Sequence, residues 1–430
     1  MTSDTTEKAP DEAYVWTWLP GATLPVVAGR LSRADNQILF NYGRSYLARP
    51  DAIPLYEPEL PLRDGTLPLL NGLIIPNCIR DAAPDAWGRR VIINRKFGRV
   101  NTDFDTASID ELTYLLDSGS DRAGALDFQV SPSTYAGRQS NASLDDLLMA
   151  ADNIEQGTPL PAALDNAMLH GSSIGGARPK ALIEADNRKY VAKFSAQNDL
   201  YSVVKAEFIA MRLAAQAGLN VSNVELVHVA DKDVLLVERF DRTRADDKWQ
   251  RHAFVSVLTL LELDEMQARY ASYEDLATIV RHRFVTPKQT LKELFGRMLF
   301  NILCGNTDDH ARNHAAFWNG KNLALTPAYD ICPQGRSGGE ASQSMLIDGD
   351  RRASRIALCI EASANFQVSR DEAIATAKHQ IITIRDNWDR VCDEAHLPPV
   401  ERNLFWRRQF LNAYAFEDAP PEIAELVASN

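Results

Sequence analysis

The polar segment of residues 305–314, GNTDDHARNH, restricts most strongly how this chain can fold. It follows directly on the apolar run MLFNILC of residues 298–304 and precedes residues 315–325, AAFWNGKNLAL. An Asn-Gly pair between two apolar runs is a strong signal for a β-hairpin. The polar segment is therefore expected to be a loop between a buried helix and a hairpin.

Two chemical interpretations of this loop compete, and a solvated loop without a catalytic role is the third. His310 and His314 are four residues apart, the spacing that places two imidazoles on one helical face for a metal ion. The hairpin signal that follows argues against a helix here, and Ala311 stands where a zinc protease has its glutamate. Asp308 and Asn313 are five residues apart, which is the separation of the base and a magnesium ligand in kinase catalytic loops.

The order of residues along the chain favours the kinase interpretation. Asp308, Asn313, the hairpin and then Asp330 follow one another as base, metal ligand, hairpin and second metal ligand do in protein kinases. Phosphoryl transfer needs a carboxylate to take the proton of the nucleophile, and oxygen ligands to hold Mg²⁺ on the phosphates. Protein kinases place a histidine before the aspartate, whereas His310 follows it here.

Candidates for nucleotide binding precede this loop. Residues 170–180, HGSSIGGARPK, form a Gly-rich segment that can offer backbone N–H groups to phosphates. Lys193 lies on a predicted strand and Glu207 on the next predicted helix, so a Lys193–Glu207 pair could orient the lysine onto ATP. Residues 235–241, LLVERFD, are a strand leading into a hinge that would face adenine. Each feature alone is equally well explained by a surface charge or a common loop, so their shared order carries the interpretation.

Length, composition and charge limit the class of protein. A chain of 430 residues is long enough for two or three domains. Its composition of 45% hydrophobic and 24% charged residues is typical of a soluble globular protein, and its net charge of −12 argues against a broad nucleic-acid surface. The five cysteines are scattered, and no secretory signal or membrane-spanning run is recognisable. We expect a cytoplasmic protein with reduced thiols.

Local patterns predict a flexible tail over residues 1–13 and then three regions, 14–143, 144–240 and 241–430. The first region combines strands with a helix over residues 84–98 and ends in a linker over residues 131–143. The second, a nucleotide-binding N-lobe, is expected to contain a hairpin over residues 180–194 turning at Asp186-Asn187, a helix over residues 203–220 ending near Gly218, and a hairpin over residues 223–240. The third is mostly helical, with apolar periodicity predicting helices over residues 255–263, 291–304, 370–391 and 402–416.

These motifs together resemble the HipA family, the serine/threonine-kinase toxins of bacterial type II toxin–antitoxin systems. Residues 40–62 are also similar to the N-terminal subdomain of that family. The resemblance implies an α+β, two-lobed protein-kinase-like fold with an extra N-terminal α/β subdomain and a mostly helical C-terminal lobe. The segments that carry it are GGARPK (175–180), VAKF (191–194), VERFDR (237–242), GNTDDHARN (305–313) and YDI (329–331).

The resemblance also implies the cofactors ATP and Mg²⁺ and a set of site residues. Asp308 is expected to be the catalytic base, with Asn313 and Asp330 as the magnesium ligands. Ser173, in the phosphate loop, is expected to be autophosphorylated, which would switch the enzyme off. The other residues expected at the nucleotide are Gly175, Gly176, Ala177, Lys180, Lys193, Glu207, Glu238, Phe240 and His310.

Two residues depart from the family pattern. Asp309 stands where a small or apolar residue is usual, and Arg178 stands where glutamine is usual. Only Asp308 has the five-residue step to Asn313, because the step from Asp309 is four. We therefore expect Asp309 to face solvent or to cap a turn, and Asp309→Asn to keep most activity.

The resemblance finally implies transfer of the ATP γ-phosphate to a serine or threonine of a protein. The implied target is an aminoacyl-tRNA synthetase, with glutamate–tRNA ligase as the first candidate. A helix-turn-helix antitoxin of the HipB type is the implied partner, and it would bring this acidic chain to DNA indirectly. A small-molecule kinase on the same scaffold and an inactive pseudokinase acting as a co-repressor scaffold stay open, although no catalytic position is missing.

Overall fold

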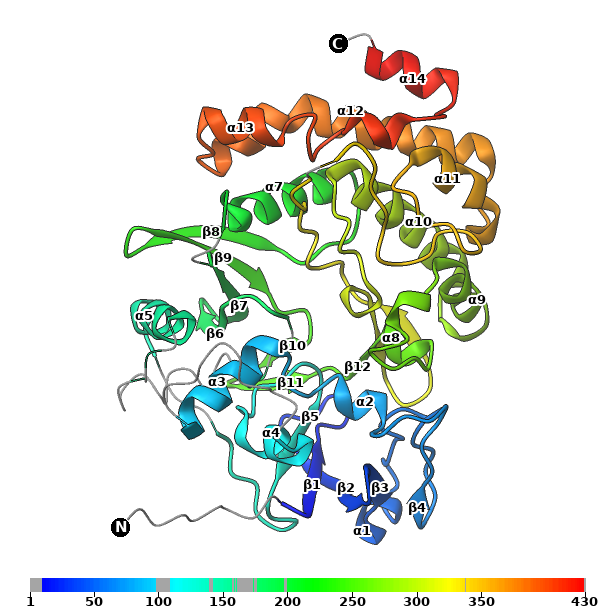
Figure 1. The fold of residues 1–430 in the computed structure, drawn as a ribbon. Helices are drawn as coiled ribbons and strands as arrows, with labels where there is room; N and C mark the ends of the chain where they lie inside the picture. Colours follow the sequence, from blue (N-terminus) through cyan, green and yellow to red (C-terminus); the bar gives the residue numbers. More distant parts are fainter. Residues whose placement is uncertain are drawn as a thin grey trace. The chain divides into compact units, whose positions relative to one another are not determined.

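The computed structural model describes residues 10–97, 109–138, 142–156, 158, 160, 173, 176–196, 199–336 and 338–428 (Figure 1). The chain forms two compact units, each with helices and strands, which confirms the predicted α+β class. Unit 1 comprises residues 1–197, 241–254 and 319–321, and unit 2 comprises residues 198–240, 255–318 and 322–430. The predicted functional boundaries at residues 143 and 240 stay predictions.

Unit 1 is built on an antiparallel sheet with strand order β4-β3-β2-β1-β5. Leu31 and Phe40 pair across β2 and β3 and are both fully buried. Helix α4 packs against β1 and β5, and α3 packs against α4 and α5. The helices and strands of unit 1 are β1 (Glu12–Thr17), β2 (Val26–Ala34), β3 (Gln37–Tyr42), α1 (Arg44–Leu47), β4 (Thr66–Leu67), α2 (Asn77–Arg80), α3 (Ala86–Phe97), α4 (Glu111–Asp117), β5 (Leu126–Gln129), α5 (Leu144–Glu155), β6 (Lys180–Ala185), β7 (Arg188–Phe194), β10 (Arg242–Ala245) and β11 (Lys248–Arg251).

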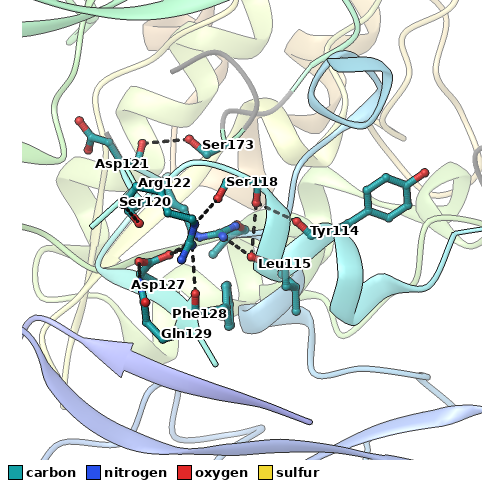
Figure 2. Close-up of polar contacts among 12 residues, drawn as sticks. Tyr114, Leu115, Ser118, Ser120, Asp121, Arg122, Asp127, Phe128, Gln129 and Ser173 are labelled. Atoms are coloured by element: carbon teal, nitrogen blue, oxygen red, sulfur yellow. Dashed lines mark hydrogen bonds and ion pairs between the residues drawn. The ribbon is translucent and has the colours of Figure 1, made fainter. Parts of the chain in front are cut away.

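A buried ion pair lies in the core of unit 1 (Figure 2). Arg122 and Asp127 are both fully buried, and Arg122 Nε donates to Asp127 Oδ1 at 2.9 Å. The remaining Arg122 nitrogens donate to the carbonyl oxygens of Ala82 and Leu115. Burial lowers the pKa of Arg122 to about 10, with the charge of Asp127 opposing the shift. Because both charges are hydrogen-bonded, the pair can stay ionised away from water.

Unit 2 is mostly helical. Helix α12 packs against α7, α10, α11 and α14, and α9 packs against α10 (Figure 1). Its helices and strands are α7 (Val203–Gln216), β8 (Val224–Val229), β9 (Lys232–Glu238), α8 (Val257–Leu260), η3 (Ala268–Tyr270), α9 (Tyr273–Arg283), α10 (Pro287–Cys304), η4 (Ala311–Asn313), β13 (Ala315–Trp318), β14 (Leu323–Leu325), α11 (Ile356–Glu361), η5 (Ala362–Phe366), α12 (Arg370–Glu394), α13 (Pro399–Phe405), η6 (Ala413–Phe416) and α14 (Pro421–Ala428), while β12 (Phe254–Ser256) carries the chain into this unit. Within the described ranges, no helix is both long enough and apolar enough to cross a bilayer.

The predicted hairpins are confirmed. Strands β6 and β7 pair around Asp186 and Asn187, whose φ angles of 48° and 58° are those of a tight hairpin turn. Strands β8 and β9 pair around Ala230 and Asp231. Strands β13 and β14 pair from Trp318 to Leu323, so the Asn-Gly pair begins a four-residue loop and does not form a two-residue turn by itself.

The predicted helices are confirmed in most places and wrong in two. Helices α3, α7, α10 and α12 form where expected, and α7 is followed by Gly218 in a left-handed conformation. The predicted helix over residues 255–263 starts as strand β12 and keeps only four helical residues in α8. The predicted helix over residues 402–416 ends at Phe405 in α13, because Trp406 and Phe410 pack against Trp388 of α12.

Two further predictions at chain segments need correction. Residues 131–138 are not a linker: the Tyr135 ring lies 5.5 Å from the rings of Trp16 and Trp18, and Arg138 Nη2 donates to Asp127 at 2.9 Å. The tail was predicted over residues 1–13, but residues 12 and 13 belong to strand β1, and residues 1–9 lie outside the described residues.

Candidate active site

The polar loop begins where helix α10 ends. Gly305 has a φ of 75°, a left-handed conformation that favours glycine. A β-carbon at this position would also lie 2.7 Å from the backbone oxygen of Gln409, so two independent reasons require glycine here. The chain can therefore turn sharply out of a buried helix, and it presents residues 306–310 beyond the end of that helix.

Asp308 and Asn313, which the sequence paired by spacing, lie at the two ends of one closed turn. Asn313 Nδ2 donates to the backbone oxygen of Asp308 at 3.2 Å, and the His310 N–H donates to the same residue's oxygen at 2.9 Å. Asp308 is exposed, whereas Asn313 is 9% exposed. Since the Asn313 amide nitrogen is used inside the turn, its Oδ1 stays available for another ligand.

The surroundings of Asp308 suit a proton acceptor. Although the residue is exposed, neighbouring protein atoms desolvate the carboxyl and raise its pKa. His310 and a hydrogen bond from Ser344 lower the pKa, while the negative charges of Asp330 and Asp309 raise it further. A carboxylate with a raised pKa takes a proton more readily than an ordinary one. The negative charge of Asp330 thus helps to keep the pKa of Asp308 above its ordinary value.

Aromatic packing holds the segment that carries Asp330. Tyr329 donates its hydroxyl to the backbone oxygen of Arg312 at 2.8 Å, which ties this segment to the polar loop. The Phe240 ring lies 5.5 Å from the Tyr329 ring and 5.6 Å from the Phe317 ring. Asp330 itself has a φ of 59°, unusual for a residue with a side chain, as is often found at functional sites. Phe240, Asp308, Asn313 and Asp330 thus all belong to unit 2.

The sequence predicted that Asp309 faces solvent or caps a turn. That prediction was wrong, because the side chain is buried. It is 2% exposed and accepts hydrogen bonds from the Tyr273 hydroxyl and, at 2.7 Å, from His314 Nε2. Burial alone would raise the pKa of Asp309, but the His314 charge and these two hydrogen bonds outweigh burial and lower it. We define the Asp309 cluster as Tyr273, Asp309 and His314. It points into the core while the adjacent Asp308 points outward.

The same cluster contradicts the zinc interpretation. His314 is in extended backbone conformation and its Nε2 is bonded to Asp309, while His310 precedes the short 3₁₀ helix η4. The two imidazoles therefore do not share a helical face. Among the described residues, no group of three or more His, Cys, Asp or Glu side chains is arranged to hold a metal ion.

The side chains of Asn313 and Asp330 fit Mg²⁺ better than they fit zinc. An asparagine amide and an aspartate carboxylate are hard oxygen donors, which Mg²⁺ prefers, and this ion usually takes only one or two carboxylates together with waters and substrate phosphates. Asn313 Oδ1 and the Asp330 carboxylate are such donors. His310 Nδ1, which is buried without a hydrogen-bond partner among the described residues, adds a polar atom beside Asp308 that fits a ligand at this site.

The end of the Gly-rich segment is tied to helix α3 within unit 1. The Gly176 N–H donates to Asp85 Oδ2 at 2.6 Å, and the Gly176 oxygen accepts from the Trp87 N–H at 3.2 Å. Gly176 has a φ of 105°, and a β-carbon there would collide with the ammonium group of Lys180. Lys180 is buried, Ala177 is exposed, and Gly175 lies outside the described residues.

Ser173 is buried, with 1% of its surface exposed (Figure 2). Its hydroxyl donates to the backbone oxygen of Asp121 at 3.3 Å. The Asp121 carboxylate in turn accepts from Arg242 at 2.8 Å and from Lys189 at 2.6 Å. In this conformation the serine hydroxyl is held by the protein interior, so Ser173 would have to leave this position to accept a phosphate.

The other predicted nucleotide contacts lie on separate elements. Lys193 is on β7 in unit 1, and Glu207 is on α7 in unit 2 and is 2% exposed; their pairing stays a prediction. The Glu238 carboxylate, at the end of β9, accepts from Asn223 Nδ2 at 2.9 Å. This bond directs the Glu238 side chain toward Asn223. The backbone that follows β9, and not this side chain, is therefore the part suited to contact adenine as a hinge.

Sequence reasoning missed the residues that support the loop. The Asp309 cluster had one signal, since Asp309 and His314 have the same five-residue spacing as Asp308 and Asn313. Tyr273 had none, because it lies on α9. Gln343 was also missed, although its Nε2 donates to the Asn306 backbone oxygen at 3.0 Å and it is 2% exposed.

Known protein families match both parts of this chain. Residues 172–391 match the HipA-like C-terminal domain, and residues 23–129 match the HipA N-terminal domain. The serine/threonine-protein kinase toxin HipA of Shewanella oneidensis is 27% identical over 186 residues, which cover 37% of this chain and 42% of that protein. The protein Y4mE of Sinorhizobium fredii is 28% identical over 134 residues, covering 29% of this chain and 31% of that protein. The chain therefore spans less than half the length of these two relatives.

A solved structure supports the same relationship at the level of the fold. The chain is similar to HipA in the Shewanella oneidensis complex of HipA, HipB and operator DNA, with a TM-score of 0.60 and 21% identity. The match covers 96% of this chain and 94% of that chain. Since the C-terminal family match extends over more than half of the chain and the N-terminal match precedes it, this protein belongs to the HipA family.

Proposed function

We propose that the protein is an ATP-dependent serine/threonine-protein kinase of the HipA toxin type. The observation that carries this proposal is the geometry of the loop after α10. Asp308 is exposed, its backbone oxygen is held by the Asn313 amide at 3.2 Å, and the Asp330 charge acts on its carboxyl. A proton acceptor and two oxygen ligands thus lie in one unit, in the order that phosphoryl transfer uses.

In this proposal the Asp308 carboxylate accepts the proton of the attacking serine or threonine hydroxyl. Its raised pKa helps it to do so. The Asn313–Asp308 hydrogen bond fixes the distance between the base and the Asn313 ligand. The buried Asp309 cluster anchors the residue next to Asp308 in the core and so limits movement of the loop. Orienting the hydroxyl in this way can supply a large part of the rate of phosphoryl transfer.

Asn313 Oδ1 and Asp330 would hold Mg²⁺. When bound, this ion neutralises phosphate charge and orients the phosphates of ATP. The backbone after Glu238 and the Phe240 ring would contact adenine, with the Phe240 ring supported by Phe317 and Tyr329.

The remaining predicted residues would contact the phosphates. The backbone around Gly176 and Ala177, together with Lys180 and Lys193, would bind them, and Glu207 would orient Lys193. The tie of Gly176 to helix α3 supports this role, because a phosphate-binding loop must be held in place.

Ser173 is proposed as the autophosphorylated residue that switches the enzyme off. A phosphate there adds about −1.5 to −2 charges. Its buried hydroxyl, bonded to the Asp121 oxygen, is not expected to keep that position once phosphorylated, because burying a phosphate dianion away from water costs far more free energy than burying a hydroxyl.

For the target we propose a protein serine or threonine, with an aminoacyl-tRNA synthetase as the class and glutamate–tRNA ligase as the first candidate. The proposed partner is a helix-turn-helix antitoxin of the HipB type, in line with the complex formed by the Shewanella relative. A net charge of −12 supports contact with DNA only through such a partner.

The test is transfer of labelled γ-phosphate from Mg-ATP, with glutamate–tRNA ligase as acceptor. We expect label on the ligase with the wild-type protein, and none with Asp330→Ala. The exposed Asp350 of the same unit supplies the control, so Asp350→Ala should transfer as the wild type does. Equal transfer by both variants would refute the metal-ligand role. Self-labelling without transfer to the ligase would refute the target and leave the kinase activity standing.

A further inference from the structure

The start of helix α3 holds the end of the Gly-rich segment through both backbone groups of one residue. The Gly176 N–H donates to Asp85 Oδ2 at 2.6 Å, and the Gly176 oxygen accepts from the Trp87 N–H at 3.2 Å. A third bond runs from Trp87 Nε1 to the Lys180 oxygen at 3.0 Å. All of these residues belong to unit 1. Residues 176–180 are therefore fixed to α3 at both ends.

The Asp85 carboxylate bonds a segment other than its own helix. Asp85 stands at the N-cap of α3, since its backbone oxygen accepts from the Arg89 N–H at 2.8 Å. An aspartate at an N-cap usually accepts the N–H of the second or third residue of its helix. In α3 the second residue is Trp87, and its N–H donates to the Gly176 oxygen. The helix and the Gly-rich segment thus exchange one hydrogen bond in each direction.

The Gly176 N–H lies in surroundings that favour an anion. Lys180 is 4% exposed, and its ammonium group lies where it would collide with a β-carbon at Gly176. Burying an ammonium group is costly without an opposite charge nearby. An N–H and an ammonium group side by side suit an oxyanion, which a carboxylate or a phosphate can supply. In this structure the oxygen at the N–H belongs to Asp85.

The proposed function places a phosphate of ATP at the same backbone group. An N–H carries one proton, so it cannot bond fully to Asp85 and to a phosphate oxygen together, and the two anions would repel each other. We propose that the Asp85 carboxylate occupies the place of a phosphate oxygen of ATP and must leave the Gly176 N–H before ATP binds there. This inference rests on the proposed kinase function, which assigns the Gly176 backbone to the phosphates.

The Gly-rich segment stays in place when Asp85 leaves. The bonds from Trp87 to the Gly176 oxygen and to the Lys180 oxygen do not involve the carboxylate. Trp87 is fully buried, which keeps its indole N–H in position. Release of Asp85 therefore frees one N–H without freeing the segment. The Asp85 contact thus lowers the affinity for nucleotide and is not needed to position the segment.

Isothermal titration calorimetry of the full-length protein with Mg-ATP and, separately, with adenosine tests this inference. Asp85→Ala should lower the Kd for Mg-ATP by roughly 10-fold or more, because a hydrogen bond to a charged group favours the occupied conformation by such a factor. Asp85→Asn keeps an acceptor oxygen without the charge and should lower the Kd by roughly 3-fold, since a neutral bond is about half as strong. The Kd for adenosine, which has no phosphate, should stay at the wild-type value in both variants.

Asp64→Ala is the matched control. The Asp64 carboxylate also accepts a glycine N–H, from Gly65 at 2.9 Å, but this residue is exposed and belongs to no predicted site. The control should bind Mg-ATP as the wild type does. The urea midpoint of each variant shows whether its fold is kept, and Asp85→Asn, which preserves the size of the side chain, decides the outcome if Asp85→Ala unfolds.

Three results would overturn the inference. An unchanged or raised Kd for Mg-ATP in a folded Asp85→Asn protein would show that the carboxylate does not compete with phosphate, and it would leave the kinase function intact. An equal gain in affinity for Mg-ATP and adenosine would show a general opening of the site instead of competition at the phosphates. Failure of the wild type and of both Asp85 variants to bind Mg-ATP would overturn the proposed function, and this inference with it.

Discussion

The replacement Tyr273→Phe tests whether the buried Asp309 cluster supports the catalytic loop. Tyr273 is fully buried, and its hydroxyl donates to the Asp309 carboxylate and lies 3.1 Å from His314 Nε2. The change removes one hydrogen bond to a buried charge and keeps the ring. Such a bond contributes about 1.5–3 kcal/mol, so the unfolding equilibrium constant should rise by roughly 10- to 150-fold.

Urea unfolding followed by intrinsic fluorescence measures this loss. The control is Tyr270→Phe, because Tyr270 is 61% exposed and its replacement should change the free energy of unfolding by less than about 0.5 kcal/mol. Tyr273→Phe should also cost less in an Asp309→Asn background, where the acceptor is no longer charged. Equal midpoints for the two tyrosine variants, or the same cost in both backgrounds, would refute the role assigned to the cluster.

Two further changes probe other parts of the fold. Gly305→Ala places a β-carbon 2.7 Å from the Gln409 oxygen at a φ of 75°, so it should destabilise the protein by more than about 1 kcal/mol, and an unchanged Tm would contradict this. Glu59 is buried and burial raises its pKa to about 7, above the unfolded value of 4.5, although N–H groups of Asn77 and Cys78 oppose the shift. Its stabilising contribution is complete below pH 4.5 and is lost as the pH rises through about 7, so the free energy of unfolding should fall across this window in the wild type and not in Glu59→Gln.

The parts of the fold that depend only on residues adjacent in the sequence were predictable from the sequence. The turn at Asp186-Asn187 adopts the left-handed backbone conformation that these residue types tolerate. Helix α10 ends at Gly305 because glycine adopts the same conformation without strain. The helix predicted over residues 402–416 was wrong because Trp406 and Phe410 pack against Trp388, in a helix that periodicity within the segment cannot reveal.

In the candidate site, too, residues close in the sequence were predictable, whereas contacts between distant segments were not. The spacing of Asp308, Asn313 and Asp330 reflects a short loop and hairpin, so it was visible in the sequence. The burial of Asp309 was not visible, because its donor Tyr273 lies far away in the sequence on helix α9 and two adjacent aspartates look alike in a sequence. Ser344 belongs to no motif, and only the folded chain brings it to Thr307.

Phosphoryl transfer by Asp308→Asn tests the central claim most directly. The side chain is exposed, and the loop contact with Asn313 uses the Asp308 backbone, so the replacement should leave the fold intact. Transfer from labelled Mg-ATP should fall by roughly 10²–10⁴-fold, the usual effect of losing a general base. The Kd for Mg-ATP and the urea midpoint should stay at their wild-type values. An Asp308→Asn protein that transfers phosphate at the wild-type rate would contradict the account.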